Sequence, residues 1–415
     1  MITARDVLPA GGVLLSAAVL SVAGLVAPSL LAGPDTTGAV AMEVTRALAC
    51  PSAPLGESTA RLLDNSSGRD EVASRLAGSD PASPARVLPA GAHQATGGVW
   101  LSGLPRPSVS WWGACQPGTA DQMVQLANPA KTKLLLVNPG TVDAEVDITL
   151  YGTEGPLQAI GTSGITVPAG RQALVPVSVQ APAGKPVGAR IVASQGRVAA
   201  WALVDDGVGA DYVPATAPEN SAVIPTVPMG STSSVLLTNP SDQRTTVRMV
   251  AHSRRGAFDP SGAAETVLEP GTTTLVDVSR SFAGEAGSLS LSSDQPVAAT
   301  LWASSGKDLA FTPAQAPSSG RSTLLLPAAG SVLFTNPEAT DRQVSVTQPG
   351  GGSRDWTVPA GGVVSIDVAQ AGLVSFTSGV AAGAVVSSPG LSIIASQDDG
   401  RVQAVPRLEQ DPGLR

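Results

Sequence analysis

The chain has 415 residues, a formal net charge of −8 and 43% hydrophobic residues, with only 3% aromatic residues. Nucleic-acid binding needs concentrated positive charge to displace counterions, and no basic stretch of that kind is present, so nucleic acid is not an expected partner. The 45 glycines and 35 prolines interrupt helices and favour many short strands joined by tight turns.

The N-terminal part of the sequence is strongly apolar. Val7 to Pro34 contains no charged residue, and 13–31 is almost wholly aliphatic, which is long enough for a membrane-spanning helix of about 20 residues. Arg5 on its N-terminal side predicts a cytoplasmic N-terminus and export of the remainder. Residues 1–35 are interpreted as a signal anchor, with a cleaved signal ending near Ala39-Val40-Ala41 as the alternative and a buried soluble helix as the third. The signal anchor predicts a single-pass membrane protein, and the cleaved signal predicts a secreted one.

Residues 45–125 form the next expected domain, a degenerate β domain. It contains the two cysteines of the chain, Cys50 and Cys115. In an oxidising compartment such a pair most simply forms one disulfide within the domain, with two unrelated buried thiols as the alternative. Metal binding is not expected, because neither cysteine has a His or Cys companion at ligand spacing.

Three further segments repeat the same landmarks in the same order. Each begins with an apolar run ending in Asn-Pro, continues to a Pro-Gly or Pro-x-Gly turn, and closes with a strand that begins Val-Ala-Ala. The Asn residues are Asn138, Asn239 and Asn336, and the closing strands begin at Val198, Val297 and Val380. The turns are Pro168-Ala169-Gly170, Pro270-Gly271 and Pro359-Ala360-Gly361. Repetition at about 100 residues has the length of a small β-sandwich domain.

The pattern within each copy predicts strands of two kinds. The opening run, such as Leu134 to Val137, reads as a strand buried on both faces, whereas Ala144 to Leu150 alternates apolar and polar residues and predicts one wet face. About seven short strands per unit are typical of an immunoglobulin-like sandwich. The predicted fold is therefore all-β, with tandem immunoglobulin-like β-sandwich domains after the single N-terminal hydrophobic helix. Their expected bounds are 130–222, 230–320 and 327–403, followed by a tail at 404–415.

No reactive centre is expected. The two histidines, His93 and His252, fall in different units without a catalytic motif. Ser304 to Lys307 matches an S-x-x-K string but aligns with a hairpin turn in the preceding copy. The acidic residues Asp205, Asp206 and Asp211 are the least improbable metal ligands, yet they lack the spacing of a calcium loop. The chain is predicted not to be an enzyme, and no cofactor, metal or catalytic residue is assigned.

Three tryptophans are the only candidate ligand-binding residues. Trp112, Trp201 and Trp302 lie in or beside the Val-Ala-Ala strand of successive units, in an alignment that puts the rings on one face. Burial as a core plug between sheets is the first interpretation. An exposed platform that stacks on sugar rings or on a partner is the alternative.

The exported helix, the cysteine pair and the units of the form Leu-Leu-Leu-Val-Asn-Pro-Gly, Val-Pro-Ala-Gly and Val-Ala-Ala resemble an actinobacterial family of exported proteins known as a domain of unknown function, over roughly 45–405. The resemblance implies a cell-envelope protein and brings no catalytic residues. The expected function is a non-enzymatic extracytoplasmic scaffold or protein-interaction module on a membrane anchor, with an envelope protein or glycan as partner. A module that binds cell-wall polysaccharide is the alternative, and a cryptic hydrolase the third.

Overall fold

The computed structural model describes residues 40–42, 47–51, 59–64, 85–89, 93–96, 99–105, 403–405 and 110–398, the last range without 179–180, 182–183, 206, 208, 318–319, 378 and 388–389. The chain divides into two compact units, residues 1–44 with 402–415 and residues 45–401. In the first unit, β1 (Val40–Met42) pairs antiparallel with β35 (Gln403–Val405). The predicted helix at 1–35 and most of the tail lie outside the described residues, and within those described no helix has the length and hydropathy needed to cross a bilayer.

The second unit is built of β-strands, which confirms the all-β prediction; the immunoglobulin-like topology stays a prediction. Its described strands fall into four repeats. The first repeat contains β2 (Ala47–Cys50), β3 (Thr59–Asp64), β4 (Ala85–Pro89), β5 (His93–Thr96), β6 (Trp100–Pro105), β7 (Ser110–Ala114) and β8 (Gln116–Pro117). The second contains β9 (Asp121–Leu126), a 3-10 turn (Pro129–Lys131), β10 (Thr132–Val137), β11 (Ala144–Tyr151), β12 (Pro156–Leu157), β13 (Ile165–Val167), β14 (Gln172–Pro176), β15 (Val187–Gln195), β16 (Ala199–Asp205) and β17 (Ala210–Pro214).

The third and fourth repeats follow the second closely. The third contains β18 (Glu219–Val227), β19 (Thr232–Thr238), β20 (Thr245–Ser253), β21 (Gly256–Phe258), β22 (Glu265–Leu268), β23 (Thr273–Asp277), β24 (Gly287–Ser304) and β25 (Leu309–Pro313). The fourth contains β26 (Ser322–Leu326), β27 (Gly330–Thr335), β28 (Arg342–Thr347), β29 (Ser353–Val358), β30 (Val363–Val368), β31 (Gly372–Phe376), β32 (Ala381–Val386), β33 (Ser392–Ala395) and β34 (Gln397–Asp398). The strands β9, β18 and β26 thus begin before residues 130, 230 and 327, where the sequence predicts the domains to start.

Each repeat contains one four-stranded layer of the same connectivity. These layers have the orders β4-β3-β6-β7, β14-β10-β16-β17, β23-β19-β24-β25 and β30-β27-β32-β33, and the third is part of a larger sheet because β24 continues into the other layer. In the second repeat, the apolar side chains of β10 and β11 face one another in one core. β11 alternates buried and exposed residues along most of its length, as its period of two predicts.

The opening strands β10, β19 and β27 are buried on both faces along most of their length, because successive repeats pack against each other. Leu134 and Leu136 of β10 belong to the core of their own repeat, whereas Leu135 packs with Ala49 and Trp111 of the first repeat. The cores of the second and third repeats also include side chains from the repeat that follows. These are Leu309 and Phe311, and Leu391 and Ile393, respectively. The repeats therefore share parts of their cores.

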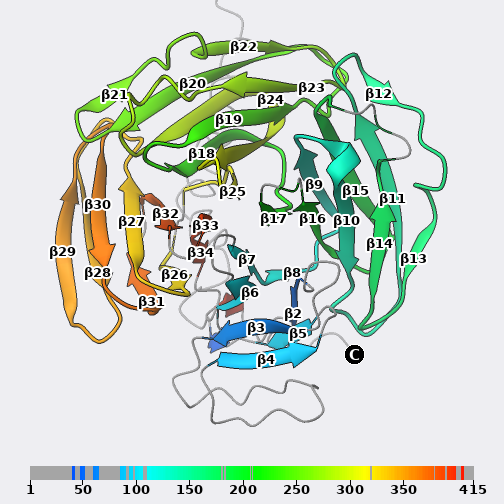
Figure 1. Cartoon of the computed structure of the whole chain (residues 1–415), viewed down its shortest axis with the longest axis horizontal. Coiled ribbons are helices and arrows are strands. Elements are labelled where there is room, and N and C mark those ends of the chain that lie inside the picture. Colours follow the sequence, from blue (N-terminus) through cyan, green and yellow to red (C-terminus); the bar gives the residue numbers. More distant parts are fainter. Residues whose placement is uncertain are drawn as a thin grey trace, which may run out of the picture. The chain divides into compact units, whose positions relative to one another are not determined.

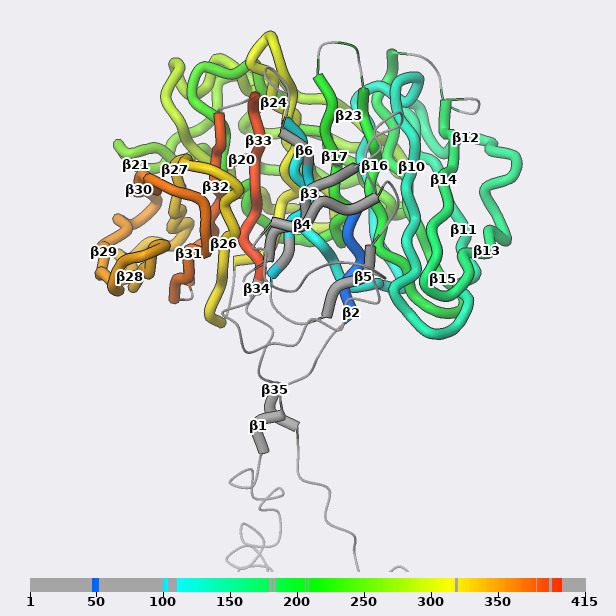
Figure 2. Tube along the Cα trace, turned by 60° about the horizontal axis from the view of Figure 1, so that its bottom comes forward, coloured from blue at the N-terminus to red at the C-terminus, as the bar shows by residue number. Residues whose placement is uncertain are grey.

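The last strand of each four-stranded layer lies at the centre of the second unit. β7 contacts β17, β17 contacts β25, β25 contacts β33, and β33 contacts β7, so the four inner strands close a ring (Figure 1). Figure 2 shows β28–β31 and β11–β15 on opposite sides of this unit, with β6, β17 and β33 between them. Residues on the inner strands consequently meet residues from three different repeats.

Candidate functional site

The three tryptophans selected from the sequence pack against other side chains and are not fully exposed to solvent. Trp201 is fully buried and Trp112 is 8% exposed, while Trp302 is partly buried against the core of the second repeat. Trp201 lies on β16, but Trp112 lies on β7, one strand nearer the centre. A stacking platform needs an exposed ring face, and Trp112 and Trp201 do not offer one. Both rings are packed inside the protein.

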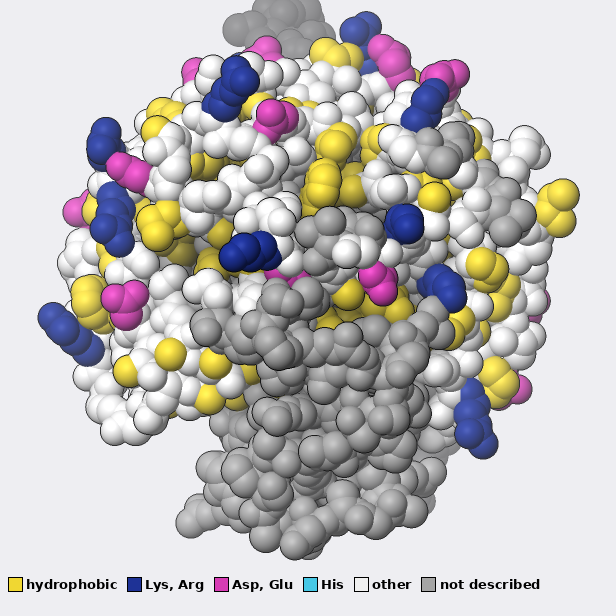
Figure 3. Space-filling model, in the orientation of Figure 1, with side chains coloured by type: hydrophobic (Ala, Val, Ile, Leu, Met, Phe, Trp, Pro, Cys, Tyr) yellow, Lys and Arg dark blue, Asp and Glu magenta, His cyan; other side chains and the backbone are white. Residues whose placement is uncertain are grey.

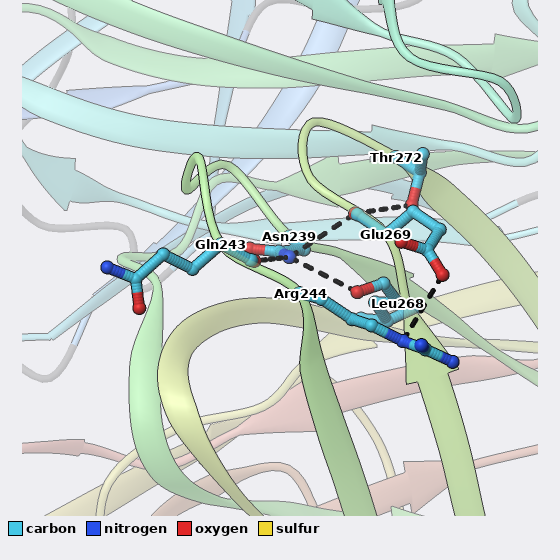
Figure 4. Close-up of polar contacts among 6 residues, drawn as sticks. All are labelled: Asn239, Gln243, Arg244, Leu268, Glu269 and Thr272. Carbon is cyan, nitrogen blue, oxygen red and sulfur yellow. Dashed lines mark hydrogen bonds and ion pairs between the residues drawn. The ribbon is translucent and has the colours of Figure 1, made fainter.

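A buried asparagine anchors the turn after the opening strand in three repeats. Figure 4 shows Asn239, which directly follows β19. Its side-chain oxygen accepts a hydrogen bond from the backbone N–H of Ser241 at 3.1 Å, as the predicted Asn-Pro turn requires. Its amide group donates to the carbonyl oxygens of Gln243 at 2.7 Å, Leu268 at 3.4 Å and Glu269 at 3.3 Å. One side chain thus joins two turns about 30 residues apart in the sequence.

The same arrangement occurs at the two equivalent positions. Asn138 accepts from the backbone N–H of Gly140 and donates to the carbonyl oxygens of Val142 and Val167. Asn336 accepts from Glu338 and donates to Thr340, Val358 and Pro359. All three asparagines are completely buried, and the Pro-Gly turns that they hold contain Gly170, Gly271 and Gly361 with positive φ. The Asn-Pro motif therefore stabilises these turns and is not a binding motif.

Two buried carboxylates lie where the inner strands meet. Asp211, on β17, is 2% exposed, and its oxygens accept hydrogen bonds from the backbone N–H groups of Tyr212 at 2.8 Å and Phe311 at 3.2 Å. The backbone N–H of Trp112 is a further donor. Asp211 of the second repeat is thereby joined to the third and first repeats.

Asp308 makes the complementary connection from the third repeat. It is completely buried just before β25, and its Oδ1 accepts from the backbone N–H of Leu309 at 2.9 Å. Its Oδ2 accepts from Ser110 of the first repeat at 3.0 Å and from Leu391 of the fourth repeat at 2.9 Å. Asp211 and Asp308 together therefore connect all four repeats through backbone donors.

Asp211 and Asp308 are placed to hold the repeats together rather than to act on a substrate. A catalytic carboxylate must reach a substrate, but both of these are buried and hydrogen-bonded on both oxygens. Asp205, in contrast, is exposed and accepts from Gly207 in its own turn, while Asp206 lies outside the described residues. Among the described residues, no group of three or more His, Cys, Asp and Glu side chains could hold a metal ion.

Burial raises the pKa of Asp211 well above 3.8, the charge of Asp308 raises it further, and the backbone donors Tyr212, Phe311 and Trp112 oppose the shift. The folded protein then binds the proton more tightly than the unfolded chain, so this group makes folding less favourable as the pH rises from about 4 through its raised pKa. We expect the stability of the wild type relative to Asp211→Asn to fall over that window. Urea unfolding of both proteins across pH measures it. A difference independent of pH would contradict the prediction.

The two histidines lie on strands of different repeats. His93 lies on β5 of the first repeat. His252 is buried on β20, where its Nδ1 lies 2.9 Å from the carbonyl oxygen of Gly361 and its Nε2 lies 2.8 Å from Ser290 Oγ. Burial lowers the pKa of His252, and the hydrogen bond to Gly361 opposes that shift. His252 therefore joins the third and fourth repeats as a neutral side chain.

The predicted disulfide between Cys50 and Cys115 is present. It ties the end of β2 to the residue that follows β7, and both cysteines are buried. Replacing both by serine is expected to lower the free energy of unfolding by about 2–4 kcal/mol, because the unfolded chain loses a covalent loop of 65 residues. Denaturant unfolding of the oxidised wild type, the reduced wild type and the double variant measures the loss. A double variant as stable as the oxidised wild type would contradict this expectation.

Comparisons with known proteins identify a family but no activity. A model described as "Family of unknown function (DUF5719)" matches residues 113–369, which confirms the expected resemblance to a family without an assigned function. No curated protein matches. The alpha-L-rhamnosidase of Streptomyces avermitilis, solved with L-rhamnose, is 11% identical, and the match covers 86% of this chain and 55% of that chain with a TM-score of 0.15. A TM-score this low carries no argument about fold or function.

Proposed function

We propose a structural role for this chain, which belongs to the family of unknown function DUF5719. In this proposal it is a non-enzymatic protein of the extracytoplasmic face of the cell envelope, held by its N-terminal apolar segment and serving as a scaffold or protein-interaction module. The disulfide supports an oxidising compartment. The apolar, uncharged sequence from Val7 to Pro34 supports the anchor.

The observation that carries the scaffold proposal is the use of buried polar groups to join repeats. Asp211, Asp308 and His252 would be the natural candidates for chemistry, yet each bonds to backbone or hydroxyl groups of its surroundings. Threonines make further connections: Thr273 Oγ1 donates to the carbonyl oxygen of Tyr151 at 2.8 Å, and Thr335 Oγ1 to Ser288 Oγ at 2.8 Å. Such a body would hold its surface loops in fixed relative positions, which suits a module that presents a partner-binding surface.

The surface offers several elements to a partner. The outer strands β4, β14, β23 and β30 are edge strands of their four-stranded layers. In the described sheets each is paired on one side only. Such edges bind extended segments of other proteins by strand addition. Figure 3 shows basic and acidic side chains interspersed over the described part of one face. A mixed surface of this kind favours specific contacts over nonspecific attraction to a charged polymer.

The alternatives have less support. The polysaccharide-binding alternative was based on tryptophan platforms, and the burial of Trp112 and Trp201 leaves it without that basis. A hydrolase would need carboxylates that converge in an accessible cleft, whereas Asp211 and Asp308 are buried. The scaffold is therefore the function that we put forward.

Crosslinking in intact cells tests the proposal. A C-terminally tagged full-length protein is crosslinked and isolated, and its co-purifying proteins are identified by mass spectrometry. We expect a defined envelope protein, recovered in stoichiometric amount and lost without crosslinker or tag. A C-terminal alkaline phosphatase fusion, which folds only where disulfides form, should be active. Recovery of the tagged protein alone would contradict the scaffold role, and an inactive fusion would contradict export.

A further inference from the structure

A cleft of about 720 Å³ lies between the third and fourth repeats, and one of its lining residues, Leu391, donates its backbone N–H to Asp308. Its volume falls within the range of small-molecule sites, roughly 300–1,000 Å³. The turns after β18, β20 and β24 form one side, and the strands β27, β30 and β32 form the other. The two sides come from different repeats, and ligand sites are common at such junctions.

Two cations line this cleft in a protein of net charge −8. Arg254 and Lys307 are both exposed, and no ion pair or hydrogen bond of either side chain is found among the described residues. Their neighbour Arg255 differs, because it pairs with Glu285 at 2.9 Å. Asp367 is the only acidic residue among the lining residues that the structure describes. The cleft thus has a local positive charge and two donor groups available for an anion.

The remaining lining combines hydroxyl groups with a small apolar surface. Ser331, Ser365 and Ser387 have no side-chain hydrogen bond in the described structure, and each could bond to a ligand. Thr226 also lines the cleft, and its Oγ1 is buried with no hydrogen-bond partner among the described atoms. A buried hydroxyl without a partner is costly, and a bound group or a rotation of the side chain would relieve that cost. Met229, which is 75% exposed, adds apolar surface at the edge.

From this combination we infer that the cleft binds an anionic saccharide. The cations would pair with a carboxylate or phosphate group, the serines and Asp367 would bond to sugar hydroxyls, and Met229 would contact the apolar face of the ring. No aromatic residue is among the described lining residues, which argues against a nucleobase, since bases are held by stacking. The inference goes beyond the scaffold proposal and does not depend on it.

Calorimetric titration of the full-length protein with three sugars tests the inference. We expect D-glucuronate, glucose 6-phosphate or both to bind at one site, and uncharged glucose to bind at least tenfold more weakly. Binding of glucuronate alone identifies a carboxylated ligand, and binding of glucose 6-phosphate alone identifies a phosphorylated one. If neither sugar binds, or if glucose binds equally well, the inference is overturned.

Variants locate the binding. Arg254→Ala and Lys307→Ala are each expected to weaken the anionic sugar at least tenfold, because each removes an ionic partner. Arg255→Ala is the matched control: it lies next in sequence, is equally basic and is paired outside the cleft, so affinity should stay within twofold. All three residues are exposed, and a thermal melt confirms that folding is retained. Equal affinity of the Arg254 and Lys307 variants and the wild type would place the binding elsewhere and overturn the inference. Its failure leaves the crosslinking result for the scaffold unaffected.

Discussion

Asp308→Asn is expected to destabilise the second unit by about 1–3 kcal/mol, although it changes the shape of the side chain very little. The carboxylate accepts backbone N–H groups from Ser110, Leu309 and Leu391 with its two oxygens. An asparagine offers one oxygen, and its NH₂ group must face at least one of these donors. A buried N–H group is then left without an acceptor, and two groups that both donate are brought together. Denaturant unfolding of the purified protein measures the loss.

Amide hydrogen exchange provides a second measurement, because it shows where Asp308→Asn loosens the structure. Oδ2 of Asp308 holds the amides of Ser110 and Leu391, which are on different repeats. In Asp308→Asn these two amides should exchange with solvent deuterium faster than in the wild type, beyond what the global loss of stability explains. Asp205→Asn is the matched control, because Asp205 is exposed and its hydrogen bond among the described residues is to Gly207 of its own turn. A variant as stable as this control would show that Asp308 does not hold the repeats together.

The sequence was sufficient to predict local structure where a single repeat determines it. The alternation of Ala144 to Leu150 predicted a half-exposed strand, and β11 has that pattern. The Pro-Gly turns and the hairpin at Ser304 were predicted from residues that adopt few backbone conformations. The double-sided burial of Leu134 to Val137 was also predicted correctly. The residue that covers the second face of this strand was not predicted, because that contact comes from Trp111, in a distant part of the chain.

The alignment of the first repeat shows why the site residues were harder to predict. Trp112 was aligned with Trp201, which lies on β16, the strand that pairs with β10. In the first repeat the equivalent strand is β6, which pairs with β3 and begins at Trp100. The first repeat has no Val-Ala-Ala signal, so similarity of composition shifted the alignment by one strand. Asp308 was passed over for a related reason. An isolated acidic residue beside a turn is usually solvated, and only the closing of the ring buries it.

The cleft residues were missed because their sequence context is ordinary. Arg254 and Lys307 each occupy a turn, 53 residues apart, with no motif around them. They share a cleft because the turn between β18 and β19 lies between them: the end of β18 pairs with the start of β24, beside the end of β20, and the start of β19 pairs with the end of β24. A signal was nevertheless present: Lys307 is a lysine in a chain whose positive charges are mostly arginine. Such a signal is too weak to identify a site without the topology.

Replacing Asn239 should have the largest effect of any single change at the surface turns. Asn239→Asp keeps the oxygen that accepts from Ser241 but replaces the NH₂ group with a second oxygen that faces the carbonyl groups of Gln243, Leu268 and Glu269. Because the site is completely buried, this repulsion cannot be screened by water. We expect a loss of at least about 3 kcal/mol in the free energy of unfolding, and a loss of about 2–4 kcal/mol for Asn239→Ala, which removes the bonds without adding charge.

The neighbouring ion pair supplies a control within the same turn. Arg244 Nε lies 3.2 Å from Glu269 Oε1, but both side chains are more than half exposed, so Arg244→Ala should cost less than about 1 kcal/mol. The equivalent changes Asn138→Asp and Asn336→Asp should resemble Asn239→Asp, because both asparagines make the same bonds in their own repeats. If the aspartate variants instead match Arg244→Ala, the amide groups do not hold these turns, and the Asn-Pro motif would owe its recurrence to the backbone conformation of the turn alone.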